Sequence, residues 1–237
     1  RIQNMFRSLR TVSIIVPCYN EKQTVGELLD RLIAAPIPAD WKKEIIVVDD
    51  ASYDGTCDIL KRYEREMRVV YCDENGGKGT AVRCGIACAT GEYVIIQDAD
   101  LEYDPRDIQS LLSVIENRTA EVVYGSRNLS PLTRSGGLIA RAGVWFITKL
   151  INLLYGLSLT DVWTCYKLFP REAAGDFMAG HFESELLFTA ALARRGYRFA
   201  EVAISYAPRA VAEGKKIRYR DGIHAILLII ADWVRHF

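Results

Sequence analysis

The sequence predicts a single α/β domain, with a mostly parallel sheet flanked by helices. Three observations support this prediction. Short β-branched runs alternate with helix-length segments from residue 11 to residue 96, and the connections between them are short. Such alternation favours parallel strands joined by crossover helices on the faces of the sheet. The 237 residues are half hydrophobic and a quarter charged, as in a globular domain, and contain no repeat, low-complexity tract or linker.

The first half of the chain contains four predicted strands, each followed by a predicted helix. Each strand is a β-branched or aliphatic run that is bounded by proline, glycine or acidic residues. The strands span 11–16, 44–48, 68–72 and 93–96, and the helices span 21–34, 56–66, 80–89 and 105–117. Pro36 and Pro38 end the first helix, and Asp104 before Pro105 is the predicted N-cap of the fourth.

The second half continues the alternation with longer connections. Strands are predicted at 121–124, after the turn 160–167 and within 196–206, and helices at 138–155, 182–195 and 219–237. The loop 130–137, Ser-Pro-Leu-Thr-Arg-Ser-Gly-Gly, has the composition of a mobile segment, and we expect it to move over bound substrates.

Two of these helices, 138–155 and 219–237, are predicted to lie in a membrane interface. Both place tryptophan among aliphatic residues, with charges nearby, as interfacial helices do. Their charges make spanning unfavourable. Packing of both helices on the sheet is the alternative. One polar stripe is predicted on each helix: Arg141, Thr148, Lys149 and Asn152 on the first, and Asp221, His224, Asp232 and Arg235 on the second.

Three acidic residues follow the strand 93–96 within five positions: Asp98, Asp100 and Glu102. Carboxylates this close repel one another unless a cation lies among them. Hard oxygen ligands suit Mg²⁺ or Mn²⁺, and Mg²⁺ is usually held by one or two carboxylates together with substrate phosphates. The sequence therefore predicts a divalent metal that grips a diphosphate, with an acidic solvated turn as the alternative.

Polar groups also follow the first two strands, as Tyr19-Asn20-Glu21 and Asp49-Asp50. Ligands of parallel α/β sheets bind beyond the carboxyl ends of the strands, so we expect these groups and the acidic cluster to converge in one crevice. The loop Asn75-Gly-Gly-Lys78-Gly79 opens a helix and could present N–H groups and a lysine to a phosphate. It lacks the spacing of a Walker loop or a dinucleotide fingerprint.

Charge and cysteine content exclude two other classes. Lys+Arg and Asp+Glu number 30 each, which argues against a general nucleic-acid binder, so any anion site is local. The six cysteines show no zinc-site spacing and are typical of small buried hydrophobic residues in a reducing compartment.

Taken together and in order, these residues resemble family 2 glycosyltransferases with the GT-A fold. Within them, the chain is most similar to dolichyl-phosphate mannose and glucose synthases and their bacterial and archaeal polyprenyl-phosphate relatives. The resemblance extends from Thr11 to Arg220. It rests on the motifs Pro17-x-Tyr19-Asn20-Glu21, Asp49-Asp50-x-Ser52-x-Asp54-Gly-Thr56, Asn75-x-Gly-Lys78-Gly, Asp98-Ala-Asp100-Leu, Gly125-Ser-Arg127 and Arg209…Lys215.

The resemblance implies a role for each matching position. The residues that would line the nucleotide-sugar pocket are Pro17, Tyr19, Glu21, Val48, Asp50, Lys78, Asp98 and Ala99. Asp100 and Glu102 would ligate the Mg²⁺ or Mn²⁺ that bridges the donor diphosphate. The catalytic group would comprise Asp100 and the cations that face donor or acceptor phosphates: Arg127, Arg209 and Lys215.

The implied reaction is inverting transfer of a sugar from GDP-mannose or a UDP-sugar to a polyprenyl or dolichyl phosphate, at the cytoplasmic face of a membrane. A lipid phosphate is already anionic near neutral pH, so it needs no general base. Two alternatives remain open. One is transfer to a sugar hydroxyl, which requires a base, for which Glu183, Glu185 and Asp161 are the candidates. The other is an inactive nucleotide-sugar-binding module.

The chain departs from the family pattern at two places. Mannose synthases often have Gln at the position of Glu102, and they have Gly-Phe-Arg where this chain has Cys165-Tyr166-Lys167. Both departures leave the donor sugar open. The Gln-x-x-Arg-Trp motif of processive polysaccharide synthases is absent.

Overall fold

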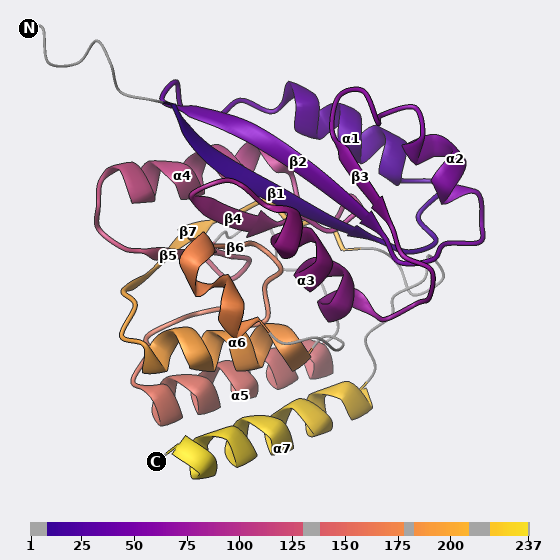
Figure 1. Ribbon diagram of the computed structural model, residues 1–237. Coiled ribbons are helices and arrows are strands. Elements are labelled where there is room, and N and C mark those ends of the chain that lie inside the picture. The colour runs from indigo at the N-terminus through magenta and orange to yellow at the C-terminus, as the bar shows by residue number, and fades with distance from the viewer. Residues whose placement is uncertain (1–8, 130–137, 178–182, 209–218, 237) are drawn as a thin grey trace, which may run out of the picture.

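The computed structural model describes residues 9–129, 138–177, 183–208 and 219–236. Their centre is a seven-stranded sheet with the order β3-β2-β1-β4-β6-β5-β7 (Figure 1). The strands are β1 (Arg10–Cys18), β2 (Trp41–Asp49), β3 (Arg68–Tyr71), β4 (Tyr93–Ile96), β5 (Val122–Ser126), β6 (Lys167–Pro170) and β7 (Phe199–Ala203). All neighbouring strands are parallel except β6, which is antiparallel to β4 and β5. The predicted mostly parallel sheet is confirmed.

Strand β1 lies inside the sheet and is buried on both faces. It pairs with β2 from Arg10 opposite Trp41 to Cys18 opposite Asp49, and its other edge pairs with β4. A strand covered on both faces is expected to be a continuous apolar run rather than an alternating one. Ile14 and Ile15, which point to opposite faces, are both fully buried.

Helices cover both faces of the sheet and create two apolar cores. The first core holds side chains of α1 (Val25–Ala34), α2 (Thr56–Leu60) and α4 (Ile108–Glu116). The second core holds side chains of α3 (Lys78–Cys88), α5 (Leu138–Tyr155), α6 (Glu183–Arg194) and α7 (Tyr219–His236). Two short 3₁₀ helices, η1 (Pro105–Asp107) and η3 (Arg171–Asp176), complete the described elements. Helices α5, α6 and α7 lie together at one end of the molecule (Figure 1).

Several helix boundaries differ from the prediction. The predicted helix 56–66 ends at Leu60 and continues as turns, in which Tyr63 donates its hydroxyl hydrogen to Gly26 O and Asp30 Oδ1 on α1. These tertiary bonds favour a tight turn against α1 over a longer helix. Helix α3 begins at Lys78, two residues earlier than predicted, which places this lysine in the first turn.

The polar stripes predicted on α5 and α7 do not all face solvent. Thr148 is buried, and its hydroxyl accepts a bond from Val162 N. The Asn152 amide bonds both the N–H and the carbonyl of Leu159, at 3.0 and 2.7 Å. Asp232 on α7 accepts the Tyr155 hydroxyl hydrogen at 2.7 Å, so it faces α5. These residues fasten the two helices to the domain, because buried polar groups need partners.

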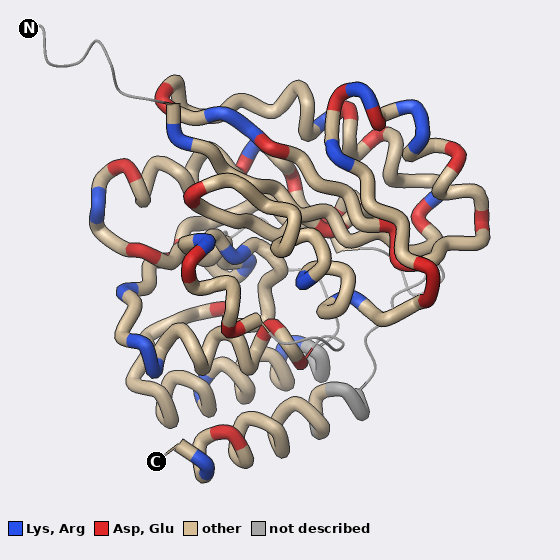
Figure 2. The backbone as a smooth tube through the Cα atoms, in the orientation of Figure 1, with Lys and Arg blue, Asp and Glu red and all other residues tan. Residues whose placement is uncertain are grey.

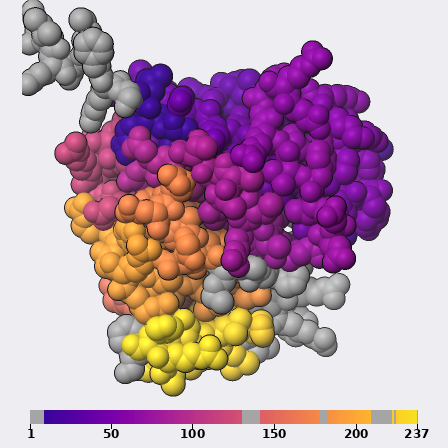
Figure 3. All heavy atoms as spheres, in the orientation of Figure 1, coloured from indigo at the N-terminus to yellow at the C-terminus, as the bar shows by residue number. Residues whose placement is uncertain are grey.

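The outward surface of α5 and α7 is largely apolar. The exposed large hydrophobic side chains are Trp145, Phe146 and Leu153 on α5 and Leu227, Ile230 and Val234 on α7. Figure 2 shows few charged residues along the described parts of α5 and α7, and Figure 3 shows α7 at the molecular surface. No helix among the described residues is long and apolar enough to cross a membrane.

Candidate active site

The carboxyl ends of β1, β2 and β4 converge at one edge of the sheet. Cys18 lies opposite Asp49, and β4 runs parallel on the other side of β1. Among the described residues, four non-glycine residues have positive φ, and three of them follow these strands: Asn20 at 53°, Ala51 at 59° and Leu101 at 62°. Strained backbone of this kind collects at functional sites. The strand ends that carry the predicted polar groups are thus neighbours, and a ligand crevice between them remains a prediction.

The turns after β1 and β2 are bonded to each other. Asn20 N donates to Ser52 Oγ at 2.9 Å, and Tyr53 N donates to Asn20 Oδ1 at 3.0 Å. Glu21 N donates to Thr56 Oγ1 at 3.0 Å. The small polar residues of the second motif thus brace the loop that presents the first motif to the crevice.

Asp50 anchors the glycine loop that opens α3. Its two carboxylate oxygens accept the N–H groups of Gly76 and Gly77, each at 2.9 Å, and the side chain is buried. Gly77 has a φ of 82°, a conformation that favours glycine. The carboxylate therefore shapes the loop that carries Lys78, and a contact between Asp50 and a nucleoside remains a prediction.

Lys78 reaches from α3 into the acidic cluster. Its Nζ lies 2.7 Å from Asp98 Oδ1 and 2.8 Å from Glu185 Oε1, and it donates to Cys165 Sγ at 3.1 Å. Burial alone would lower the pKa of this ammonium, but Asp98 and Glu185 help to raise the pKa well above its usual value. Lys78 therefore remains a cation within the cluster.

Glu185 on α6 joins Lys78 to a second buried lysine. Its Oε2 lies 3.0 Å from Lys167 Nζ, and Lys167 is fully buried. Burial would raise the pKa of Glu185, but the two lysines lower it from its ordinary value of 4.5 to about 2. A carboxylate held this acidic is a poor general base near neutral pH. The interpretation of Glu185 as a base is therefore not supported by its surroundings.

Asp100 and Glu102 follow Asp98 in the turn after β4. Asp100 Oδ1 accepts Glu102 N at 3.1 Å, and Glu102 Oε2 accepts the Tyr206 hydroxyl hydrogen at 2.9 Å. Among the described residues, no group of three or more His, Cys, Asp and Glu is placed to hold a metal ion. The cation at Asp98 is Lys78, so a divalent metal would draw its protein ligands from Asp100 and Glu102. Two hard carboxylates that leave positions for phosphate oxygens fit Mg²⁺ or Mn²⁺.

Arg127 follows β5 and forms a two-point ion pair. Its Nε and Nη2 lie 2.7 and 2.8 Å from the two oxygens of Asp161, which is fully buried. The guanidinium carbon also lies 5.1 Å from the centre of the Tyr206 ring. Asp161 therefore orients Arg127, and its burial keeps it from serving as a base for a substrate hydroxyl. Contact between Arg127 and a phosphate remains a prediction.

The remaining predicted residues divide between the crevice and the undescribed segments. Pro17 pairs with Val48 in the sheet, and Val48 and Ala99 are buried. The half-buried Tyr19 ring meets Tyr53 edge-on, with 6.2 Å between ring centres. Arg209, Lys215 and the loop 130–137 lie outside the described residues.

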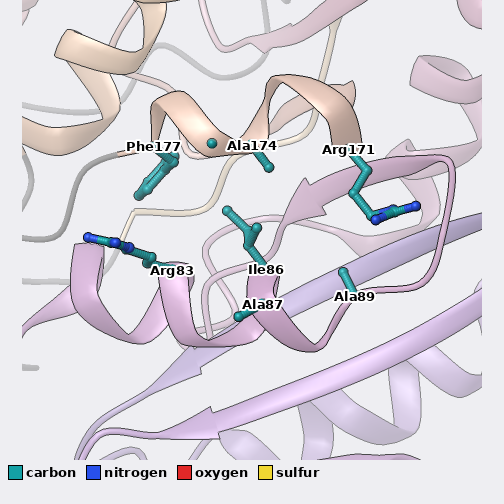
Figure 4. Close-up of a pocket in the computed structure, with 8 residues that line it drawn as sticks. Arg83, Ile86, Ala87, Ala89, Arg171, Ala174 and Phe177 are labelled. Carbon is teal, nitrogen blue, oxygen red and sulfur yellow. The ribbon is translucent and has the colours of Figure 1, made fainter.

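A separate pocket of about 350 Å³ lies between α3 and η3 (Figure 4). Arg83 and Arg171 lie toward its two ends in that view, and apolar side chains such as Ile86 and Phe177 lie between them. None of the predicted site residues within the described ranges lines this pocket. It is therefore distinct from the crevice at the strand ends.

Sequence reasoning did not find the link from Lys167 through Glu185 to Lys78, nor the bond from Tyr206 to Glu102. Lys167 and Glu185 are 18 positions apart, and neither belongs to one of the sequence motifs named above. One signal was available. Lys167 and Glu185 are charged residues beside apolar runs, and such residues are rarely buried unless they are paired.

Comparison with known proteins places this geometry in a family. The Glycosyl transferase family 2 model matches residues 13–177. Dodecaprenyl-phosphate galacturonate synthase of Rhizobium johnstonii is 34% identical over 163 residues, which are 67% of this chain and 47% of that relative. Dolichyl-phosphate beta-glucosyltransferase of Dictyostelium discoideum is 28% identical over 217 residues, which are 82% of this chain and 66% of that relative. The chain thus spans between about half and two thirds of these relatives.

Solved structures share the fold. Glucosyl-3-phosphoglycerate synthase from Mycobacterium tuberculosis, in complex with Mn²⁺, UDP and phosphoglyceric acid, aligns with a TM-score of 0.69 at 20% identity. The alignment covers 94% of this chain and 78% of that one. S. aureus TarS 1–349 in complex with UDP-GlcNAc aligns with a TM-score of 0.64, also at 20% identity, and covers 94% of this chain and 66% of that one.

Proposed function

The chain belongs to glycosyl transferase family 2 and has the GT-A fold, and from that premise we propose that it makes a polyprenyl-phosphate sugar. The proposed reaction is metal-dependent, inverting transfer of a sugar from GDP-mannose or a UDP-sugar to the phosphate of a polyprenyl or dolichyl lipid. The dodecaprenyl-phosphate galacturonate synthase and the dolichyl-phosphate beta-glucosyltransferase, to which the chain is similar, support this proposal.

The donor would bind in the crevice at the ends of β1, β2 and β4. Tyr19 and Tyr53 offer aromatic surface for a nucleoside at one side, and Lys78 offers a cation for phosphate at the other. Asp100 and Glu102 would hold Mg²⁺ or Mn²⁺, which when bound stabilises negative charge on the departing nucleoside diphosphate. Asp50 supports this site indirectly, by fixing the loop in front of Lys78.

The observation that carries the choice of acceptor is the state of the candidate bases. The pKa of Glu185 is lowered to about 2 by its two lysines, and Asp161 is buried against Arg127. A sugar hydroxyl must lose a proton during transfer, whereas a phosphate monoester is already a nucleophilic anion. Of the three candidates, only the half-buried Glu183 is not excluded on these grounds. A phosphate acceptor fits these surroundings better than a hydroxyl acceptor.

A lipid acceptor stays in the bilayer, so the enzyme must come to it. The exposed apolar side chains on α5 and α7 provide a surface for peripheral binding, and Trp145 with Arg141 and Lys149 supplies aromatic and basic contacts. We place this binding at the cytoplasmic face of the membrane. Arg209, Lys215 and the loop 130–137 are further candidates for acceptor contact on the sequence alone.

The test is a donor screen with the purified chain. GDP-mannose and several UDP-sugars are incubated with a short polyprenyl phosphate and Mn²⁺ or Mg²⁺, and lipid products are identified by mass spectrometry. The matched control acceptor is the corresponding polyprenol, which has a hydroxyl in place of the phosphate. We expect product only with the phosphate and only without excess chelator. Transfer to the polyprenol alone would contradict the proposed acceptor.

A second experiment addresses the remaining candidate base. Glu183→Gln is expected to slow transfer to the lipid phosphate only modestly, because no proton has to be removed. A loss of about 10⁴-fold would instead identify Glu183 as a general base.

An inactive binding module would bind a nucleoside diphosphate with no turnover of any donor in the screen.

A further inference from the structure

Four charged side chains form a continuous chain of ion pairs beside the crevice. Asp98 follows β4, Lys78 opens α3, Glu185 lies on α6, and Lys167 begins β6. The successive nitrogen–oxygen distances are 2.7, 2.8 and 3.0 Å. The charges alternate in sign, so the four groups together are neutral.

The far end of this chain is fixed within the protein interior. Lys167 is fully buried, donates to the Thr164 carbonyl and lies 5.1 Å from the centre of the Tyr124 ring. The Tyr124 hydroxyl bonds Thr189, and Thr189 donates to the Glu185 carbonyl oxygen at 2.9 Å. Lys167 therefore has no access to a ligand and can act on the crevice only through Glu185.

The near end is the only part that reaches the crevice. The Lys78 and Asp98 side chains are 12% and 16% exposed, compared with 4% for Glu185 and 0% for Lys167. A lysine side chain has four flexible bonds and loses much rotamer entropy when a ligand immobilises it. Carboxylates from two different elements already hold the Lys78 ammonium in one place. That entropy is therefore lost on folding rather than on binding.

We propose that Glu185 and Lys167 are positioning residues, which hold Lys78 in place to contact the diphosphate of the donor. This inference rests on the proposed function, because it takes the position of the donor from there. Glu185 sets the location of the ammonium. Lys167 offsets the charge of Glu185, which would otherwise add a negative charge to a site that must accept an anion.

A purely structural role for the pair makes a different prediction. If Glu185 and Lys167 only join α6 to the sheet, replacing both with apolar residues would leave donor binding unchanged. Removing one partner alone does not separate the two roles, because the other charge is left buried and unpaired. Replacing both together avoids that problem, since buried ion pairs often tolerate apolar replacement.

The experiment therefore compares three variants with the wild-type chain: Lys78→Met, the double variant Glu185→Leu/Lys167→Met, and the triple variant that combines them. Binding of GDP and of UDP with Mn²⁺ is measured by titration calorimetry, which requires no turnover, and thermal unfolding is recorded for each protein. The matched control is Arg194→Met/Asp232→Leu, which removes another α6 ion pair without touching the crevice. A second double variant, Glu185→Gln/Lys167→Gln, retains hydrogen bonding across the pair and is measured in case the apolar double variant does not fold.

Lys78→Met is expected to weaken nucleoside-diphosphate binding roughly 10- to 100-fold, the loss typical of one hydrogen bond to a charged group. A folded double variant is expected to bind about 10-fold more weakly. The triple variant should bind no more weakly than Lys78→Met, because both changes remove the same contact. The control should bind like the wild type.

Wild-type affinity in a folded double variant would overturn the positioning role, and so would additive losses in the triple variant. Both results would leave the proposed function standing, provided Lys78→Met still weakens binding. A wild-type chain that binds neither nucleotide would overturn the proposed donor site, and the positioning role with it.

Discussion

The crevice at the strand ends and the layer of α5, α6 and α7 are held together in different ways. In the crevice, short polar side chains bond backbone groups of neighbouring turns, as Ser52 and Thr56 bond Asn20 and Glu21. In the helical layer, long side chains join distant segments, as Asp232 joins Tyr155 and Arg194. The turns at the crevice hold buried carboxylates such as Asp50, whereas the layer buries polar groups such as Thr148 and exposes large apolar side chains such as Trp145.

This difference separates groups that serve chemistry from groups that serve assembly. A variant in the crevice should change activity more than stability, and a variant in the layer should do the reverse. The chain from Asp98 to Lys167 is the exception, because it runs from the crevice to α6. The following predictions test this division, from the largest expected effect to the smallest.

The largest effect is expected for Asp100→Ala. Loss of a predicted metal ligand should reduce turnover by about 10³-fold or more, because charge on the leaving diphosphate is no longer neutralised. The melting temperature should change little, since Asp100 is only half-buried at the crevice. Initial rates and thermal unfolding are the measurements. Asp104→Ala, which removes the cap of η1 four residues away, is the control and should spare activity. Full activity of Asp100→Ala would contradict the metal assignment.

The next effect concerns acid stability and Glu185. Its pKa is lowered from 4.5 to about 2 in the folded state. A depressed carboxyl pKa stabilises the fold above the unfolded-state pKa, and that stabilisation is lost as the pH falls through the folded-state pKa. The window therefore runs from about pH 4.5 down to about pH 2, and the loss is on the order of 3 kcal/mol.

Denaturant unfolding at a series of acidic pH values measures this loss. The double variant Glu185→Leu/Lys167→Met should show a shallower decline than the wild type over the same window, because the titrating group is gone. Identical slopes in the two proteins would contradict the assigned pKa. A shallower decline in the double variant would show that one residue, Glu185, links the crevice to the stability of the layer.

A smaller effect is expected for Asn152→Ala in α5. The change removes both bonds to Leu159 and should lower the unfolding free energy by about 1–3 kcal/mol. Nucleoside-diphosphate affinity should remain that of the wild type. Asn128→Ala, which loses an exposed bond to Thr160, is the matched control and should cost less. A large change in affinity with unchanged stability would break the division between crevice and layer.

The smallest effect is expected for membrane binding by the outer surface of the layer. Trp145→Glu should weaken binding to anionic vesicles about 10-fold, because a 61% exposed aromatic side chain is replaced by a charge. Co-sedimentation measures this binding, and turnover of a water-soluble acceptor analogue should be unchanged. Ile33→Glu on α1 provides a control on the opposite face of the sheet. If the wild-type chain stays in the supernatant at low salt, membrane docking by this surface is excluded.

Much of the crevice could be predicted from the sequence because its determinants are local. The β-branched run of β1 and the acidic residues after β4 are each visible within ten positions. Turn residues such as Ser52 and Asp54 act on groups close in the chain or on the adjacent strand end. The parallel topology then follows from the alternation of strand and helix, so the strand ends meet without further information.

The partners of individual charged groups could not be predicted in the same way. The sequence predicts Lys78 as a phosphate contact and Asp98 as a member of an acidic trio, whereas in the structure Lys78 forms ion pairs with both Asp98 and Glu185. The sequence offers Asp161 as a candidate base, whereas in the structure it forms an ion pair with Arg127. Lys78 and Arg127 each lie in a motif, but their partners Glu185 and Asp161 come from segments outside the motifs.

The sequence by itself determined the strand runs and the turns at their ends, because hydrophobic period and turn chemistry act over a few residues. The order of its motifs carried the resemblance to the family. Only the tertiary structure decided that β6 enters antiparallel between β4 and β5, which brings Lys167 close to Glu185. It also decided that Asn152 and Asp232 face inward. Contacts between distant segments depend on how whole elements pack against one another. No local pattern specifies that arrangement, because each amphipathic helix could bury the same face against several partners.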